Sequence, residues 1–213
     1  MAEPDDGRVA VFDARGLPAG ALPRAEAWRS GLAIGAVNLL LVNARGELLL
    51  QKRPADKENG GRWDKSVGGH VDEGEDFDAT AVREAGEELF SDGRSPRVRL
   101  ARDAAHLERL LASADLDREV VFRPEALQLN LRDVRLAPDG GLRNVVYHVA
   151  SYLGRTDLAI DGFNAPAAEI AGLRYAAAAE VDALLVAGEL APNMGFLWLT
   201  HARALLELVE RRA

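Results

Sequence analysis

The feature that most constrains how this chain can fold is a glycine-rich loop that leads directly into an acidic helix. The segment GGHVDEGEDFDATAVREAGEEL, residues 68–89, contains both parts. We expect the helix to begin at Asp76, whose side chain can cap the first turn, and to end at about Phe90. One face of such a helix is apolar, which predicts that it packs against a sheet; this face comprises Ala79, Val82, Gly86 and Leu89, with Ala85 and Phe90 at its margins.

The opposite face of the predicted helix concentrates negative charge. Glu84, Glu87 and Glu88 fall within an arc of roughly 100°. Carboxylates at these spacings repel one another, and each such pair destabilises a helix by roughly a few tenths of a kcal/mol. A hard divalent cation such as Mg²⁺ prefers oxygen ligands and would turn this repulsion into attraction. The alternative interpretation is a solvated acidic surface.

The hydrophobic pattern elsewhere predicts an α+β fold, a mixed β-sheet sandwiched between helices. We expect strands at residues 8–13, 36–42, 47–53, 127–136, 145–153 and 172–176, and further helices at 23–31, 104–114, 178–188 and 194–212. Residues 54–64 are polar and glycine-rich and are expected to form a loop. These elements predict one domain over residues 1–213, with an N-terminal extension of about residues 1–33 and an excursion at about residues 93–143.

Composition excludes several classes of protein. The chain of 213 residues contains no cysteine, which excludes disulfides, thiolate metal sites and a cysteine nucleophile. A net charge of −8 argues against a general nucleic-acid binder, and the basic cluster at residues 94–102 is expected to be a solvated connector. The longest apolar stretch, residues 32–42, is too short to span a bilayer. We therefore expect a cytoplasmic protein with no nucleic-acid or membrane partner.

The acidic segment resembles the Nudix box, G-x5-E-x7-R-E-U-x-E-E-x-G-U, in which U is a bulky aliphatic residue. Six positions of the box fall in register, namely Gly69, Glu75, Arg83, Glu84, Glu87 and Glu88. The match departs at its end, where Phe90 and Ser91 replace the family glycine and aliphatic residue. Because glycine normally ends the helix at this point, Gly93 is expected to end it instead.

The resemblance implies a Nudix fold and a hydrolase that cleaves a diphosphate linkage in a nucleoside diphosphate derivative or a similar metabolite. It implies Mg²⁺ or Mn²⁺ as the cofactor and a metal-activated water as the nucleophile. Glu84, Glu87 and Glu88 would hold the metal, together with a backbone carbonyl of Gly68 or Gly69. Arg83 would orient the carboxylates and pair with Glu75 in the loop.

Residues outside the box resemble the branch that contains isopentenyl-diphosphate isomerases and their hydrolase relatives. The isomerases use a catalytic cysteine at the position of Gly68 and a glutamate that aligns with Asn144, so the acid and base for alkene isomerisation are missing here. His70 matches an isomerase metal ligand, with a structural role as the alternative. Hydrolysis is therefore the predicted chemistry, with an isomerase-like enzyme or a non-catalytic ligand-binding module as alternatives.

Further candidate site residues lie outside the box. Glu169, before the last predicted strand, is a candidate general base, with a surface carboxylate as the alternative. Arg53, Trp63 and Tyr147 are candidates for substrate binding, although both aromatic residues could instead belong to the core. The expected partner is a small-molecule diphosphate. The sequence leaves the oligomeric state open, with a homodimer as one candidate.

Overall fold

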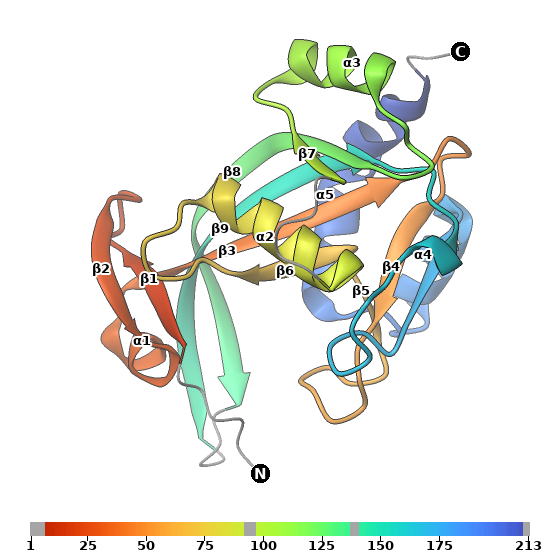
Figure 1. Ribbon diagram of the computed structural model, residues 1–213. Coiled ribbons are helices and arrows are strands. Elements are labelled where there is room, and N and C mark those ends of the chain that lie inside the picture. The colour runs from red at the N-terminus through yellow and green to blue at the C-terminus, as the bar shows by residue number, and fades with distance from the viewer. Residues whose placement is uncertain (1–6, 92–96, 137–140, 211–213) are drawn as a thin grey trace. The chain divides into compact units, whose positions relative to one another are not determined.

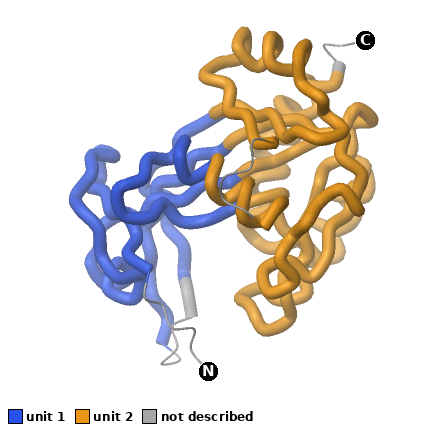
Figure 2. The backbone as a smooth tube through the Cα atoms, in the orientation of Figure 1, with its two compact units in different colours: residues 1–38, 68–81, 125–151 blue, residues 39–67, 82–124, 152–213 orange. Residues whose placement is uncertain are grey.

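The computed structural model describes residues 7–91, 97–136 and 141–210. Gly93, the predicted end of the acidic helix, and part of the basic cluster at residues 94–102 lie outside these ranges. Within them the chain separates into two compact units, coloured blue and orange in Figure 2. Unit 1 comprises residues 1–38, 68–81 and 125–151, and unit 2 comprises residues 39–67, 82–124 and 152–213. The single domain over residues 1–213 stays a prediction.

The elements follow one another in a mixed order of strands and helices (Figure 1). The strands are β1 (Arg8–Phe12), β2 (Pro18–Pro23), β3 (Ala33–Val42), β4 (Leu48–Lys52), β5 (Trp63–Asp64), β6 (Val67–His70), β7 (Val98–Leu100), β8 (Val120–Leu136), β9 (Leu142–Arg155) and β10 (Gly172–Ala176). The helices are α1 (Arg24–Ser30), α2 (Phe77–Phe90), α3 (Ala104–Ser113), α4 (Ala178–Val186) and α5 (Pro192–Glu210), with a short 3₁₀ helix, η1 (Ile160–Gly162).

The strands hydrogen-bond in the order β10-β4-β3-β9-β8-β7, while β1 and β6 pair with β3, β2 with β1, and β5 with β4. Strand β10 pairs antiparallel with β4, whereas β7 pairs parallel with β8. The sheet is therefore mixed, and the predicted α+β class is confirmed. No helix in the described part of the chain is long and apolar enough to cross a membrane.

The core of unit 2 joins strands to the two C-terminal helices. Leu40 and Leu50 of the sheet pack in one cluster with Val181 of α4 and with Leu197 and Trp198 of α5, and all five are at most 4% exposed. Burial of such side chains is the main favourable contribution to folding, at about 25 cal/mol for each Å² of apolar surface. This cluster anchors β4, the strand from which part of the candidate site projects.

The core of unit 1 lies under the N-terminal hairpin. Strand β1 pairs with β3, with Val11 opposite Ile34, and both side chains are buried. Gly35 is required at its position because a Cβ atom there would lie 2.8 Å from side-chain atoms of both Phe12 and Val71. The backbone amide of Val71 donates to the carbonyl of Gly35 at 2.9 Å, so the chain after β6 is held close to β3.

The principal predicted elements are present, with differences in extent. The predicted hairpin of residues 36–42 and 47–53 corresponds to β3 and β4, which pair antiparallel with Val42 opposite Leu48. Strands β8 and β9, at 17 and 14 residues, are longer than predicted. Strand β8 begins at Val120 and continues through Pro124, and it includes Asn130, whose φ is 59°. The sequence did not predict β2, β5, β6 or β7; β2 contains two prolines and a glycine, which disfavour strands.

Candidate active site

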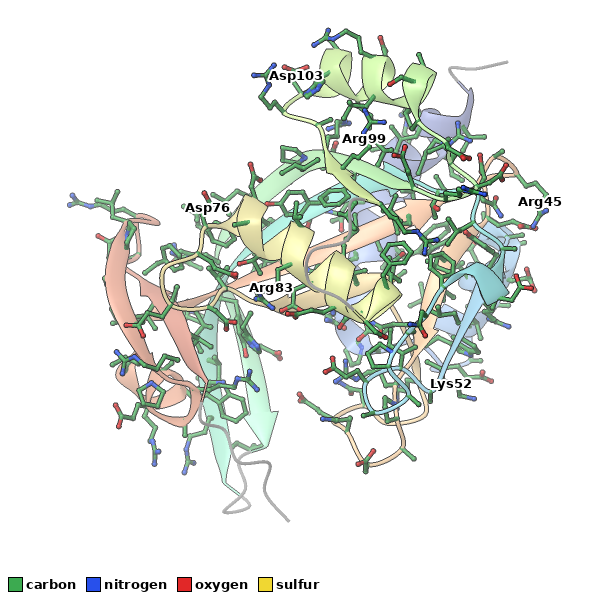
Figure 3. All side chains as sticks on the ribbon, viewed as in Figure 1. Arg45, Lys52, Asp76, Arg83, Arg99 and Asp103 are labelled. Carbon is green, nitrogen blue, oxygen red and sulfur yellow. The ribbon has the colours of Figure 1, made fainter. Side chains whose placement is uncertain are left out.

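Helix α2 begins and ends close to where the sequence predicts, with Phe77 as its first residue and Phe90 as its last. The Asp76 carboxylate accepts the backbone amide of Ala79 at 2.8 Å, so the predicted N-cap is confirmed (Figure 3). At the other end Ser91 has a φ of 55°, in the left-handed region that terminates helices. The amide of Asn164 donates at 2.9 Å to the carbonyl of Leu89, one of the carbonyls that a helix end leaves unpaired.

The buried face of α2 is rotated relative to the predicted apolar face. Ala81, Ala85 and Leu89 are at most 1% exposed, but Ala79 is exposed and Val82 is only half-buried, so the predicted burial of these two residues was wrong. The alanines are small enough for close packing along a line that also includes Glu88, which is 8% exposed. One member of the acidic face is therefore buried with the apolar residues.

The three carboxylates of α2 differ in their partners. Nη1 of Arg83 lies 3.0 Å from Oε1 of Glu84 and 2.9 Å from Oε2 of Glu87. Nε2 of Gln51, on strand β4, donates to Oε2 of Glu88 at 3.3 Å. Side-chain exposure is 13% for Glu84 and 47% for Glu87, so one guanidinium bridges a nearly buried carboxylate and a solvated one. Figure 3 shows Arg83 on the middle of the helix.

Glu75, the loop carboxylate of the box, accepts a hydrogen bond from Thr80 Oγ1 at 2.7 Å. Thr80 is fully buried in the first half of α2. This bond ties the glycine-rich loop to the helix that follows it, because acceptor and donor come from the two segments. The predicted pairing of Arg83 with Glu75 stays a prediction.

A buried polar cluster on β4 and β5 is a part of the site that the sequence reasoning missed. Gln51 and Asp64 lie opposite each other in the strand register and are 3% and 2% exposed. Oδ2 of Asp64 accepts from Arg53 at 3.2 Å, and Oδ1 lies 3.6 Å from Nζ of Lys65, which is also buried. The available signal was Gln51 itself, a polar residue that follows three leucines in a strand.

The glycines and histidine of the loop form strand β6, which pairs with β3. Gly68, Gly69 and His70 are all half-buried. The ring of His70 lies 5.9 Å from the ring of Tyr147, measured between centroids. Tyr147 is 6% exposed and packs in the core of unit 1, so its burial supports the core interpretation rather than substrate contact. Metal ligation by the carbonyls of Gly68 and Gly69 stays a prediction.

The remaining candidates are placed on the β4–β5 side of unit 2. The Trp63 ring packs on the core of unit 2 and lies 4.4 Å from the Arg174 guanidinium and 5.4 Å from Nζ of Lys52. Both cations would therefore compete with a substrate nucleobase for the faces of the indole ring. Arg53 also donates to the backbone carbonyl of Glu58 at 2.6 Å, which ties down the loop before β5. Glu169 is exposed in the turn before β10.

The donor set on α2 fits a hard divalent cation by its chemistry, since it consists of carboxylate oxygens. Among the residues that the structure describes, no three His, Asp or Glu side chains are arranged to hold a metal ion. On α2 the guanidinium of Arg83 instead contacts two of the three carboxylates. A cavity of about 290 Å³ lies in unit 1, and its lining contains none of these acidic side chains.

Comparisons with known proteins agree with this arrangement. Residues 33–128 match the family model of the NUDIX domain. The uncharacterized Nudix hydrolase PA4841 of Pseudomonas aeruginosa is 42% identical over 82 residues, which are 38% of this chain and 48% of that protein. Isopentenyl-diphosphate Delta-isomerase 2 of Photorhabdus laumondii is 34% identical over 88 residues, 41% of this chain and 50% of that protein. The chain thus spans about half the length of the curated relatives it matches.

The fold agrees over a longer part of the chain. The crystal structure of DR0079 from Deinococcus radiodurans superposes with a TM-score of 0.57 at 23% identity, over 96% of this chain and 98% of that one. Residues 33–128 thus match the NUDIX domain model, and the chain has the Nudix fold that the resemblance implied. Its relatives include both Nudix hydrolases and an isopentenyl-diphosphate isomerase, which agrees with the branch that the sequence indicated.

The contacts of Arg83 generate a prediction about stability. In metal-free buffer, Arg83→Gln is expected to lower the free energy of unfolding by about 1 kcal/mol, because Glu84 and Glu87 lose the cation that offsets their repulsion. Urea denaturation in the presence of a chelator measures this change.

The matched control is Arg203→Gln. Arg203 forms an i,i+4 pair with Glu207 on α5 at 3.2 Å, but its side chain is 94% exposed, so the loss should be at most about 0.5 kcal/mol. Equal effects of the two substitutions would show that Arg83 makes no more than an ordinary surface pair.

Proposed function

We propose that this protein is a divalent-metal-dependent hydrolase that cleaves a diphosphate linkage in a nucleoside diphosphate derivative or a similar small metabolite. The observation that carries the proposal is the acidic face of α2, on which Glu84, Glu87 and Glu88 gather beside Arg83. Such a concentration of carboxylates destabilises a helix unless a cation offsets it. A purely structural role of α2 does not account for three carboxylates at these spacings.

The residues of α2 have distinct roles in this proposal. Glu84, Glu87 and Glu88 would hold Mg²⁺ or Mn²⁺, with a carbonyl of Gly68 or Gly69 as a further ligand. When bound, the cation supplies positive charge that neutralises the diphosphate and makes water a better nucleophile. Arg83, which contacts both carboxylates, would hold Glu84 and Glu87 close together. In this proposal Glu84, whose side chain is 13% exposed, would also take a proton from the attacking water.

The proposal extends to the substrate contacts and the cellular setting. Arg53 carries a cation at the end of β4, and Glu169 is an exposed carboxylate that a substrate could recruit as a base. For Trp63 to stack on a nucleobase, the Arg174 guanidinium would have to leave the face of its indole ring. Tyr147 would contact the substrate from within the core. We propose a cytoplasmic setting and a small-molecule partner, with a homodimer as one candidate assembly.

The proposal separates hydrolysis from isomerisation by the residues at two positions. Moving a double bond within an isoprenoid diphosphate needs an acid and a base on opposite sides of the carbon framework. Gly68 and Asn144 stand where the isomerase resemblance would put these groups, and neither side chain can transfer a proton. A non-catalytic ligand-binding module is the remaining alternative, and the intact set of three glutamates argues against it.

Metal binding is the first test of the proposal. We expect isothermal titration calorimetry and manganese resonance to detect Mg²⁺ or Mn²⁺ binding by the wild-type protein. The affinity should fall sharply in Glu84→Gln and in Glu88→Gln, because each substitution removes a charged oxygen ligand. Arg203→Gln, on the exposed side of α5, should bind like the wild type. Equal affinity in the wild type and the Glu84→Gln/Glu88→Gln double variant would refute the assignment.

The reaction class is the second test. A phosphate-release screen over diphosphate compounds should show turnover that depends on Mg²⁺ or Mn²⁺, with Glu84→Gln slower by a factor on the order of one hundred or more. Isomerisation of isopentenyl diphosphate should stay at background in the wild type. It should stay there in Gly68→Cys as well, because Asn144 would still supply no acid. Wild-type isomerase turnover above its best hydrolysis rate would overturn the proposal.

A further inference from the structure

Gln51 occupies a buried position next to the acidic helix. It lies on β4, opposite Leu173 of β10 on one side and opposite Asp64 of β5 on the other. It is 3% exposed and follows three buried leucines along the strand. A buried amide that lacks a hydrogen-bond partner destabilises the fold, so we expect the Gln51 side chain to have such a partner.

The backbone around Gln51 is held by a second buried polar group. The hydroxyl of Ser66, which is fully buried, donates to the carbonyl of Leu49 at 2.6 Å and accepts from the amide of Leu41 at 2.9 Å. This bridge joins β3 and β4 two residues before Gln51. Side chains on paired strands hold a partner more precisely than side chains on loops do.

The contact of Gln51 is with Glu88, at 3.3 Å between Nε2 and Oε2. Glu88 is 8% exposed, and burial of a carboxylate is costly unless hydrogen bonds or a cation compensate. The amide of Gln51 that makes this contact is neutral. A neutral donor orients a carboxylate and leaves its negative charge in place.

We propose that Gln51 is a positioning residue that holds the Glu88 carboxylate in the orientation required to bind a divalent cation. The inference rests on the proposed function, because it assigns a supporting group to a proposed metal ligand. Gln51 acts through Glu88 and contacts neither substrate nor the reacting atoms. Hydrogen bonds to metal-ligating carboxylates are commonly worth 10- to 100-fold in metal affinity, roughly.

The test is Gln51→Met, which keeps the length of the side chain and removes the donor. Calorimetric titration of the 213-residue chain with Mn²⁺ alone, without substrate, should show affinity that is weaker by about 10- to 100-fold. The manganese resonance of the bound ion should broaden or shift. Gln51→Asn, whose amide is one methylene shorter, should show the same loss, and it serves if the methionine variant does not fold.

The matched control is Gln128→Met on β8, in unit 1. It makes the same chemical change at a half-buried glutamine of another strand, and Mn²⁺ affinity should match that of the wild type. A double-mutant cycle then separates positioning from a general structural effect. In a Glu88→Gln background, Gln51→Met should cause no further loss, because the group through which it acts is already gone.

The outcomes distinguish the inference from the function on which it rests. If the wild type and Gln51→Met bind Mn²⁺ equally well, the inference is overturned and the metal site stands. If Gln51→Met weakens binding by the same factor with and without Glu88→Gln, Gln51 acts by another route and the inference is also overturned. If the wild type binds no Mn²⁺, the proposed function fails, and the inference fails with it.

Discussion

Electrostatic repulsion on one helix is the constraint on which the rest of this site depends. Glu84, Glu87 and Glu88 share a narrow arc of α2, and repulsion between them works against the helix that presents them. Two of these carboxylates contact Arg83, and the third accepts a hydrogen bond from Gln51. The protein thus stabilises a charge cluster that the proposed cation would stabilise further.

The scaffold supports this cluster at both ends of the helix and beneath it. Asp76 caps the first turn, and Ser91 ends the last one in a left-handed conformation. Between them, Ala81 and Ala85 are fully buried and bring the helix axis close to its packing partners. Glu88 lies on the same closely packed side of α2 as these two alanines and is buried with them. A buried carboxylate needs a hydrogen-bond partner, and Gln51 supplies one.

Much of this could be predicted from the sequence, because local patterns determine it. The cap at Asp76, the extent of α2 and the β3–β4 hairpin follow from turn chemistry and periodicity. The burial of Glu88 could not be predicted, since a 100° spacing defines which residues share a face but not how far that face rotates toward the core. The role of Gln51 depends on a contact between residues 37 positions apart, and no local pattern carries that information.

The central claim is that the acidic face of α2 is stabilised by a divalent cation. Thermal unfolding of the wild type and of the Glu84→Gln/Glu87→Gln/Glu88→Gln variant, each with chelator and with Mg²⁺, tests it directly. The wild type should be no more stable than the variant in chelator. In Mg²⁺ at about 100 times its dissociation constant, the wild type alone should gain about 2.7 kcal/mol. An equal response of both proteins to Mg²⁺, or no response of either, would contradict the account.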